Sequence, residues 1–403
     1  MPNIEEYGYP LAFKMPLGVS QPPIAVNNLE EGVVATRVHV RALEGMQKEA
    51  VVTMASSAGE QTWRMVSDEG PYLDGTDLAP FPLAFFSAGL QFSFLSEIMR
   101  HTREQGVTLQ ALALSQDTFY TMNGSALQGT MIGGAKPVEV KVRIESDAAP
   151  ETIAHIVSLA RQTSPAHILM QNILSNVFSL SFNDKELAVT EVNPSSEWPA
   201  YEPEAVFAQV HPVEAADFQE GIITKLTTAE RIEGVEGGAS SSLKPIQKRT
   251  LQIHGEAKLL EGTLLETIIQ LRTPIGSTFR FLCDAGPDDG PQKITPSPMT
   301  FLSTGVGFCF MTQIGRYAHI TKQALQGYQI IQDNIYKTGE MVQVLPFNTR
   351  TFIQADEADE VAQKTLSMSE RTCFLHAAMR GSYPSVITAQ LNGTTLPLPD
   401  PEA

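Results

Sequence analysis

The sequence predicts an α+β fold in which two similar modules of one chain place antiparallel sheets around apolar central helices. One observation is an apolar stretch at 298–317 (PMTFLSTGVGFCFMTQIGRY) that has a second copy at 82–101 (PLAFFSAGLQFSFLSEIMRH). Each copy is long and continuous enough to form a buried helix. The other is that residues 64–98 align with 280–314 at a constant offset of 216, with twelve of 35 positions identical. Agreement over this length indicates an internal duplication.

The first module is expected at 34–183. It follows residues 1–33, whose Pro, Gly and Asn content predicts an extended arm. Residues 34–56 predict two strands joined by a turn, and 62–68 a third, because β-branched and aromatic residues suit a half-buried pleated surface. A loop rich in Gly, Pro and Asp then leads into the first apolar helix at Pro82, where a proline in the first turn costs little.

The remainder of this module predicts two further strands and a broken helix. Residues 107–125 read as a strand, and 138–146 alternate strictly between apolar and polar residues. Residues 147–176 predict a helix that is interrupted at Ser164–Pro165. A short strand ending near residue 183 closes the module.

Residues 184–249 do not fit the repeat and predict a connecting segment. They include an acidic, proline-bearing stretch and a Gly/Ser stretch at 233–242 (EGVEGGASSS) that is typical of a flexible linker. The pattern of the first module returns in the second module, 250–403, where QDNIY aligns with the earlier QDTFY. After a seven-residue shortening, Cys373 falls opposite Ser164. A duplication of this length predicts two modules packed as a pseudo-symmetric pair.

Composition limits the classes of partner and compartment. The 403 residues carry a formal net charge of -17, which disfavours binding to nucleic acid or to an anionic membrane surface. The longest apolar runs are interrupted by polar residues, so no transmembrane helix is predicted. The N-terminal residues lack the basic start and apolar run of a secretory signal, and three cysteines do not make a disulfide framework. We therefore expect a cytoplasmic protein.

The cysteines are the candidate reactive residues. Cys309 lies in the middle of the second apolar helix, and Cys373 begins a helix. Taken alone, each cysteine also fits a purely structural role as a buried core residue. The first module has serine at both matching places, Ser93 and Ser164, so the two thiols were gained or lost together. Cys283, on a predicted strand, is interpreted as structural.

The histidines and the metal-binding motifs give less evidence about function than the cysteines do. His376 lies three residues after Cys373, on the same side of a helix, and is a candidate base. His167 holds the same relation to Ser164, which favours a structural role for both. No CxxC, HxxxH, GxSxG, P-loop or GxGxxG pattern is present, so neither a metal nor a cofactor is predicted.

Each half resembles the OsmC/Ohr family of thiol peroxidases. The resemblance rests on the order of a strand meander, a Gly/Asp/Pro loop, an apolar helix with a mid-helix Cys, and a second Cys with His three residues on. SPMTFLSTGVGFCF and ERTCFLHAAM carry it in the second half, and FPLAFFSAGLQFSF and QTSPAHILMQN in the first. It implies an intertwined pseudo-dimer within one chain, with Cys309 as the attacking thiol and Cys373 as the resolving thiol. It also implies two small-molecule partners, an apolar organic hydroperoxide and a dithiol reductant.

The sequence departs from the family at two places. The family follows the proline that opens the helix with Glu, where this chain has Met299 or, in the other half, Leu83. The family's first hairpin supplies an Arg, which the second half lacks. Arg41 or Lys48 of the first half are candidates to replace it across the pseudo-dimer.

The substrate and the reaction stay open at this point. An apolar mouth formed by Met299, Phe308 and Phe310 would suit a bulky apolar ligand, and Arg41 is placed with them as a substrate-binding residue. The alternatives to a peroxidase are a diverged cysteine-nucleophile hydrolase or transferase with His376 as base, and a non-catalytic small-molecule-binding pseudo-dimer. Further pairing into a homodimer is left open.

Overall fold

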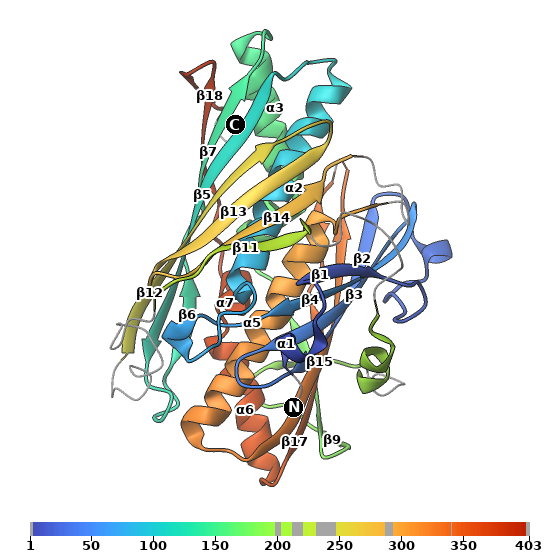
Figure 1. The fold of residues 1–403 in the computed structure, drawn as a ribbon, viewed down its shortest axis with the longest axis vertical. Helices are drawn as coiled ribbons and strands as arrows, with labels where there is room; N and C mark the ends of the chain where they lie inside the picture. The colour runs from blue at the N-terminus through green and yellow to red at the C-terminus, as the bar shows by residue number, and fades with distance from the viewer. Residues whose placement is uncertain are drawn as a thin grey trace.

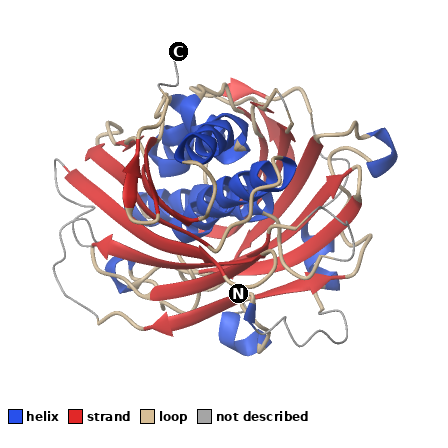
Figure 2. Ribbon diagram, turned by 90° about the horizontal axis from the view of Figure 1, so that it is seen from above, coloured by secondary structure: helices blue, strands red, loops and turns tan. Residues whose placement is uncertain are grey.

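The computed structural model describes residues 3–197, 203–211, 221–230, 247–286, 293–339 and 341–399. Two curved, mostly antiparallel sheets flank a central group of helices (Figure 1). Seen from above, the helices lie in the space that the sheets enclose (Figure 2). The expected α+β class with antiparallel sheets and apolar central helices is confirmed.

The first sheet has ten strands within the described residues, in the order β1-β4-β3-β2-β15-β17-β8-β10. Their bounds are β1 (Ala12–Met15), β4 (Gly59–Ser67), β3 (Lys48–Ser56), β2 (Val33–Ala42), β15 (Leu325–Lys337), β17 (Asn348–Ala355), β8 (Val177–Phe182) and β10 (Asn193–Pro194), with β16 (Gln343–Val344) beside β15 and β9 (Lys185–Leu187) beside β8.

The second sheet has nine strands in the described part of the chain, in the order β11-β14-β13-β12-β5-β7-β18-β19. Their bounds are β11 (Ile223–Thr227), β14 (Thr278–Asp284), β13 (Leu264–Thr273), β12 (Gln247–Leu259), β5 (Ala111–Gly124), β7 (Glu139–Glu145), β18 (Val386–Leu391) and β19 (Thr394–Leu396), with β6 (Ile132–Ala135) beside β5.

Both sheets draw strands from both halves of the chain. In the first, the meander β2–β4 joins β15 and β17 of the second half. In the second, the meander β12–β14 joins β5 and β7 of the first half. The strand that follows the broken helix of each half, β8 or β18, then pairs in parallel with β17 or β7. Neither half therefore completes a sheet by itself.

The helices observed within the described residues begin and end near the prolines and breaks that the sequence indicates. They are α1 (Ile4–Tyr7), α2 (Pro82–Glu104), α3 (Pro150–Thr163), α4 (Pro165–Gln171), α5 (Pro298–Thr321), α6 (Asp359–Thr372) and α7 (Phe374–Arg380), with the short 3-10 helices η1 (Val26–Asn28), η2 (Pro71–Leu73) and η3 (Pro203–Gln209). Helices α2 and α5 begin at the expected prolines, which need no hydrogen bond from their missing N–H. No helix in the described residues is long and apolar enough to cross a membrane.

Helices α2 and α5 contact each other through glycines. A Cβ added to Gly89 of α2 would lie 2.8 Å from the backbone nitrogen of Leu302, and one added to Gly305 of α5 would lie 2.6 Å from that of Phe86. Because only glycine permits this approach, the two backbones pack directly against each other. Their buried side chains belong to one core that includes both sheets. The core fixes α5, and therefore Cys309, at the centre of the molecule.

The segments outside the predicted repeat contain ordered strands. The expected extended arm includes α1 and β1, and β1 pairs with β4. The connecting segment includes β11, which pairs with β14 in the other sheet. The Gly/Ser stretch at 233–242 lies outside the described residues. Strands β1 and β11 thus extend the two meanders in the same way.

Candidate functional site

Cys309 and Cys373 form a buried thiol pair. Cys309 projects from the middle of α5, and Cys373 is the one residue between α6 and α7, with an extended backbone that breaks the helix there. Their Sγ atoms lie 3.4 Å apart, while the side chains are 2% and 0% exposed. Both are free thiols, and a disulfide needs the sulfurs to approach to about 2.05 Å. The tertiary fold thus brings together two cysteines that are 64 residues apart.

The first half holds two serines in the matching arrangement. Ser93 projects from α2 and Ser164 lies between α3 and α4, with their Oγ atoms 2.8 Å apart. The third cysteine, Cys283, is buried on β14, and this burial raises its pKa far above the ordinary value. A buried neutral thiol is unreactive, which agrees with a structural role for Cys283.

A buried lysine and a buried glutamate lie beside the thiol pair. Lys48, at the start of β3, is 1% exposed and interacts electrostatically with Glu69, Asp68 and Cys309. Glu69, which lies between β4 and α2, accepts hydrogen bonds from Thr312 Oγ1 and Tyr72 Oη, each at 2.9 Å. Thr312 is three residues after Cys309 on α5. The first half therefore supplies both signs of charge to a thiol site of the second half.

The second half lacks these charges at the corresponding places. In the first sheet Lys48 pairs with Ala42 and Ser67, and in the second sheet Leu265 pairs with Leu259 and Cys283. Ser67 and Cys283 align at the offset of 216, so Leu265 takes the place of Lys48. By the offset of 216, Ala285 takes the place of Glu69. The serine pair thus lacks both the cation and the carboxylate that accompany the cysteine pair.

A small cavity opens onto Cys309. Its volume is about 10 Å³, room for roughly one water molecule. Its lining residues are Glu69, Tyr72, Leu73, Phe81, Pro82, Leu83, Arg249, Leu251, Cys309, Thr312, Gln313 and Phe374. Cys373 is not among them, so Cys309 is the thiol that faces the cavity.

The two thiols ionise as a coupled pair. Burial raises the pKa of Cys309, and the adjacent Cys373 sulfur raises it further. Burial also opposes ionisation of Cys373, but its contact with Cys309 and the neighbouring His376 outweigh burial and hold the pKa of Cys373 below its ordinary value. The first proton therefore leaves the pair more readily than the second, and the resulting charge lies at the contact between the two sulfurs.

His376 lies with Cys373 and away from the cavity lining. Its ring is fully buried and packs edge-on against Phe178 and Phe310, at centroid distances of 5.3 and 5.0 Å. In the first half His167 packs against Phe94 at 4.9 Å. Because the same packing is present beside the serine pair, it does not depend on thiol chemistry.

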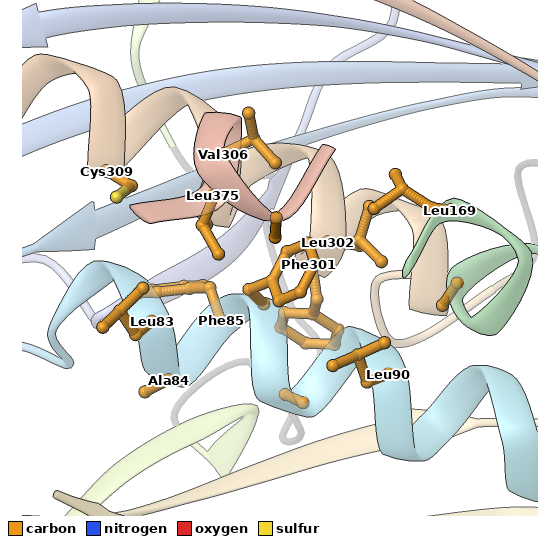
Figure 3. Packing of buried hydrophobic residues seen from close by; sticks show 14 of the residues in the cluster. Leu83, Ala84, Phe85, Leu90, Leu169, Phe301, Leu302, Val306, Cys309 and Leu375 are labelled. Carbon is orange, nitrogen blue, oxygen red and sulfur yellow. The ribbon is translucent and has the colours of Figure 1, made fainter. Parts of the chain in front are cut away.

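The side chains expected to form an apolar mouth lie in the core. Met299, Phe308 and Phe310 are at most 5% exposed, and the cavity lining does not include them. Phe308 instead packs edge-on against Phe85 at 5.2 Å. Figure 3 shows Leu83, another residue of the cavity lining, on the helix that faces Cys309. The side chain after Pro82, not the one after Pro298, therefore lines this cavity.

Of the two cations expected to replace the family's arginine, Lys48 interacts electrostatically with Cys309, although neither of them lines the cavity. Arg41 donates hydrogen bonds to Glu49 Oε2 at 2.9 and 2.6 Å and to Tyr7 Oη at 2.7 Å, outside the cavity lining. Lys258 and Glu266 form a similar ion pair in the other sheet, with 3.3 Å between Nζ and Oε1. Arg41 therefore belongs to a structural contact that both sheets contain.

Sequence reasoning missed Glu69, Tyr72 and Arg249. Glu69 and Tyr72 lie in a loop whose composition predicts only a turn, and Arg249 stands at the border of the connecting segment. A usable signal was present for Glu69, because the aligned residue is Ala285 and an acidic residue next to Asp68 is unique to the first copy. The described residues contain no group of three or more His, Cys, Asp or Glu side chains placed to hold a metal ion.

No protein-family model matches the chain, and no curated protein matches it in sequence. Among solved structures it is similar to an OsmC-like hydroperoxide resistance protein from Jannaschia sp. CCS1 at 17% identity, over 36% of this chain and 95% of that chain. The TM-score is 0.23, too low for this likeness to carry an argument about the present site. The arrangement of the buried thiol pair, Lys48 and Glu69 is what carries the functional argument.

Proposed function

We propose that this chain is a thiol-dependent peroxidase that reduces organic hydroperoxides through Cys309 and Cys373. The distance of 3.4 Å between their sulfur atoms is the observation that carries the proposal, because two-step thiol chemistry needs a second thiol within disulfide reach. Cys309 is assigned the attack, since it alone of the pair lines the cavity.

The reaction balances with these two thiols and one reductant. The Cys309 thiolate attacks one oxygen of ROOH, the O–O bond breaks, and the released alkoxide takes up the proton that the thiol lost and leaves as ROH. The product is a sulfenic acid on Cys309. Cys373 then displaces its hydroxyl as water and forms a disulfide. A dithiol reductant restores both thiols through exchange and is itself oxidised to a disulfide.

Buried ionisable groups surround Cys309. A thiolate is the reactive form, and a nearby cation stabilises it. Lys48 interacts electrostatically with Cys309, although burial lowers the pKa of Lys48, and the Glu69 carboxylate raises the pKa of Cys309. In the OsmC/Ohr family an arginine and a glutamate accompany the attacking cysteine. Lys48 and Glu69 are our candidates for these two roles, although they stand at other positions of the sequence than the family's pair.

We also propose that the chain is a tandem duplication folded as an intertwined pseudo-dimer. The corresponding strand orders of the two sheets support this, as do the reciprocal contacts of Gly89 and Gly305. Two lysines also make corresponding hydrogen bonds. Lys14 of β1 donates to the carbonyl of Lys293, and Lys225 of β11 donates to the carbonyl of Asp77. Only the second half then retains a thiol site. A reduced dithiol of this kind suits the cytoplasm.

The alternative of a cysteine hydrolase with His376 as base is less well supported. His376 lies beside Cys373, whereas the attacking thiol and the cavity are on the Cys309 side. A binding protein without chemistry is also less well supported, because packing alone does not require two thiols with Sγ atoms 3.4 Å apart where the other half holds two serines.

Stopped-flow consumption of cumene hydroperoxide by the reduced protein tests the proposal. We expect wild type to consume one equivalent and to form the Cys309–Cys373 disulfide, Cys373→Ser to stop at the sulfenic acid, and Cys309→Ser to be inactive. Ser93→Ala, at the matching place in the first half, is the control and should react like wild type. Equal and negligible rates for wild type and Cys309→Ser would contradict the proposed activity.

A further inference from the structure

We propose that residues 70–77 form a lid over Cys309, held shut by Glu69, and that this lid must lift before a hydroperoxide reaches the thiol. The inference rests on the proposed function for the identity of the substrate but not for the movement. A cavity of about 10 Å³ holds roughly one water, whereas even the smallest organic hydroperoxide has a carbon atom and two oxygens. Some part of the wall must therefore move.

The part of the wall that lies next to exposed residues is η2. Tyr72 and Leu73 line the cavity and are 8% and 6% exposed, whereas Asp74, the next residue, and Thr76 are exposed to solvent. The η2 turn thus connects the cavity lining to the protein surface. The other walls come from α2, α5, α7 and β12, which are packed into the core and the second sheet.

The base of the segment is fixed and its tip at η2 is the part that can lift: Asp77 accepts hydrogen bonds from Lys225 and Ser277, and Thr76 bonds with Gln47 and Asp68. The amide of Asp77 donates to the carbonyl of Glu69 at 3.1 Å, and that of Gly75 to the carbonyl of Gly70 at 3.2 Å, so the two ends of the loop are joined. A compact loop whose ends meet can tilt about its base without unfolding. Asp74 and Asp77 have left-handed backbones, with φ of 59° and 60°, which keep the loop folded back on itself.

Glu69 fastens the tip of this loop to α5. One carboxylate oxygen accepts from Tyr72 of the loop and the other from Thr312 of the helix, both at 2.9 Å. Tyr72–Glu69–Thr312 is therefore a latch between the lid and the helix that carries Cys309. Lifting the lid breaks the Tyr72–Glu69 contact and exposes the apolar side chains of Phe81, Leu83 and other wall residues.

Rates of Cys309 alkylation by a small and a bulky reagent test the lid without any hydroperoxide. Iodoacetamide and fluorescein-5-maleimide would be compared in the Cys373→Ser background, with Cys309 modification followed by mass spectrometry. Tyr72→Phe and Thr312→Val each remove one hydrogen bond to Glu69 and keep the side-chain shape. Both reagents are larger than one water and need the lid open, so we expect each variant to raise both alkylation rates about tenfold, in keeping with one lost charge-assisted hydrogen bond.

The pH midpoint of alkylation separates access from reactivity, since easier opening raises the rate at every pH, whereas a changed thiol pKa moves the midpoint. Tyr336→Phe is the matched control, because it removes another buried tyrosine hydroxyl, which contacts Ser303 outside the cavity lining, and should leave both rates unchanged. Unchanged rates in both latch variants would overturn the lid. Raised rates at an unchanged midpoint in a protein that consumes no hydroperoxide would support the lid while contradicting the proposed substrate.

Discussion

Ser93 Oγ lies 2.8 Å from Ser164 Oγ, in the same arrangement in which the second half holds the sulfurs of Cys309 and Cys373 at 3.4 Å. The corresponding backbones of the two halves therefore bring these two positions together whichever side chains they carry. What differs is the surroundings, because Leu265 and Ala285 stand where the thiol pair has Lys48 and Glu69. Proximity and reactivity are thus separate properties of this fold.

Ser93→Cys with Ser164→Cys should create a second disulfide but not a second active site. In a Cys309→Ser, Cys373→Ser background, we expect the new pair to close under mild oxidation with diamide, which thiol counting and peptide mass spectrometry would reveal. Hydroperoxide consumption should stay at the background rate, because no buried lysine lies at Leu265. New thiols that do not pair would argue against the proposed correspondence of the two halves.

Lys48→Met should weaken the thiolate at Cys309. The substitution removes the buried cation and keeps a similar volume, so the pH midpoint for alkylation of Cys309 by iodoacetamide should rise. A shift of about one pKa unit lowers the rate at neutral pH about tenfold. Leu265→Met, at the corresponding place in the other sheet, serves as control. An unchanged pH profile in Lys48→Met would mean that another group stabilises the thiolate.

Stability should fall in mild acid because two histidines are buried in the neutral form. Burial, aided by Arg37, lowers the pKa of His39 to about 3, and burial, aided by Arg161, lowers that of His167 to about 4. Below pH 6.5 the unfolded chain binds protons at these sites while the folded protein does not. The free energy of unfolding is therefore complete above about pH 6.5 and falls as pH drops toward 4, by up to about 1.4 kcal/mol per pH unit for each histidine.

Urea unfolding at several pH values measures this dependence. His39→Gln and His167→Gln should each flatten the slope between pH 6.5 and 4, whereas the exposed His155 of α3 should not contribute, so His155→Gln keeps the wild-type slope. If the slope is the same in all three variants, carboxylates and not these histidines set the acid sensitivity.

Gly89→Ala and Gly305→Ala should each destabilise the protein by about 1–3 kcal/mol, the usual cost of forcing extra volume into a packed core. The added Cβ atoms would lie 2.8 and 2.6 Å from backbone nitrogens of the facing helix. Urea denaturation would measure the loss. Gly327→Ala is the control, because nothing lies within 4 Å of its Cβ position. Similar small effects at all three glycines would show that α2 and α5 have room to separate.

Local sequence patterns were sufficient for most elements. Pro82 and Pro298 mark the first turns of the central helices, and the break at Ser164–Pro165 separates α3 from α4. Strand β7 follows the strict alternation seen at 138–146. These features depend on neighbouring residues alone, which is why the sequence suffices. The strand β11 was missed, since a short strand in a polar segment has no distinctive pattern before its partner β14 is known.

The candidate site was only partly predictable. The repeat singles out Cys309 and Cys373, because serine stands at both matching positions. Lys48 was one of two candidate cations, and nothing in the sequence separates it from Arg41. The tertiary structure does so: Lys48 interacts electrostatically with Cys309, while Arg41 donates hydrogen bonds to Glu49. The apolar mouth was expected at Met299 and Phe308, although α5 turns these side chains into the core.

The sequence by itself determined the fold class, the repeated pattern and the two cysteines, because periodicity, turn residues and internal alignment are local or directly comparable properties. Only the tertiary structure decided which groups surround Cys309. The two halves exchange strands, so a lysine and a glutamate of the first half lie beside a cysteine of the second, more than 200 residues away. Such proximity depends on long-range strand pairing and helix packing, which no local pattern records.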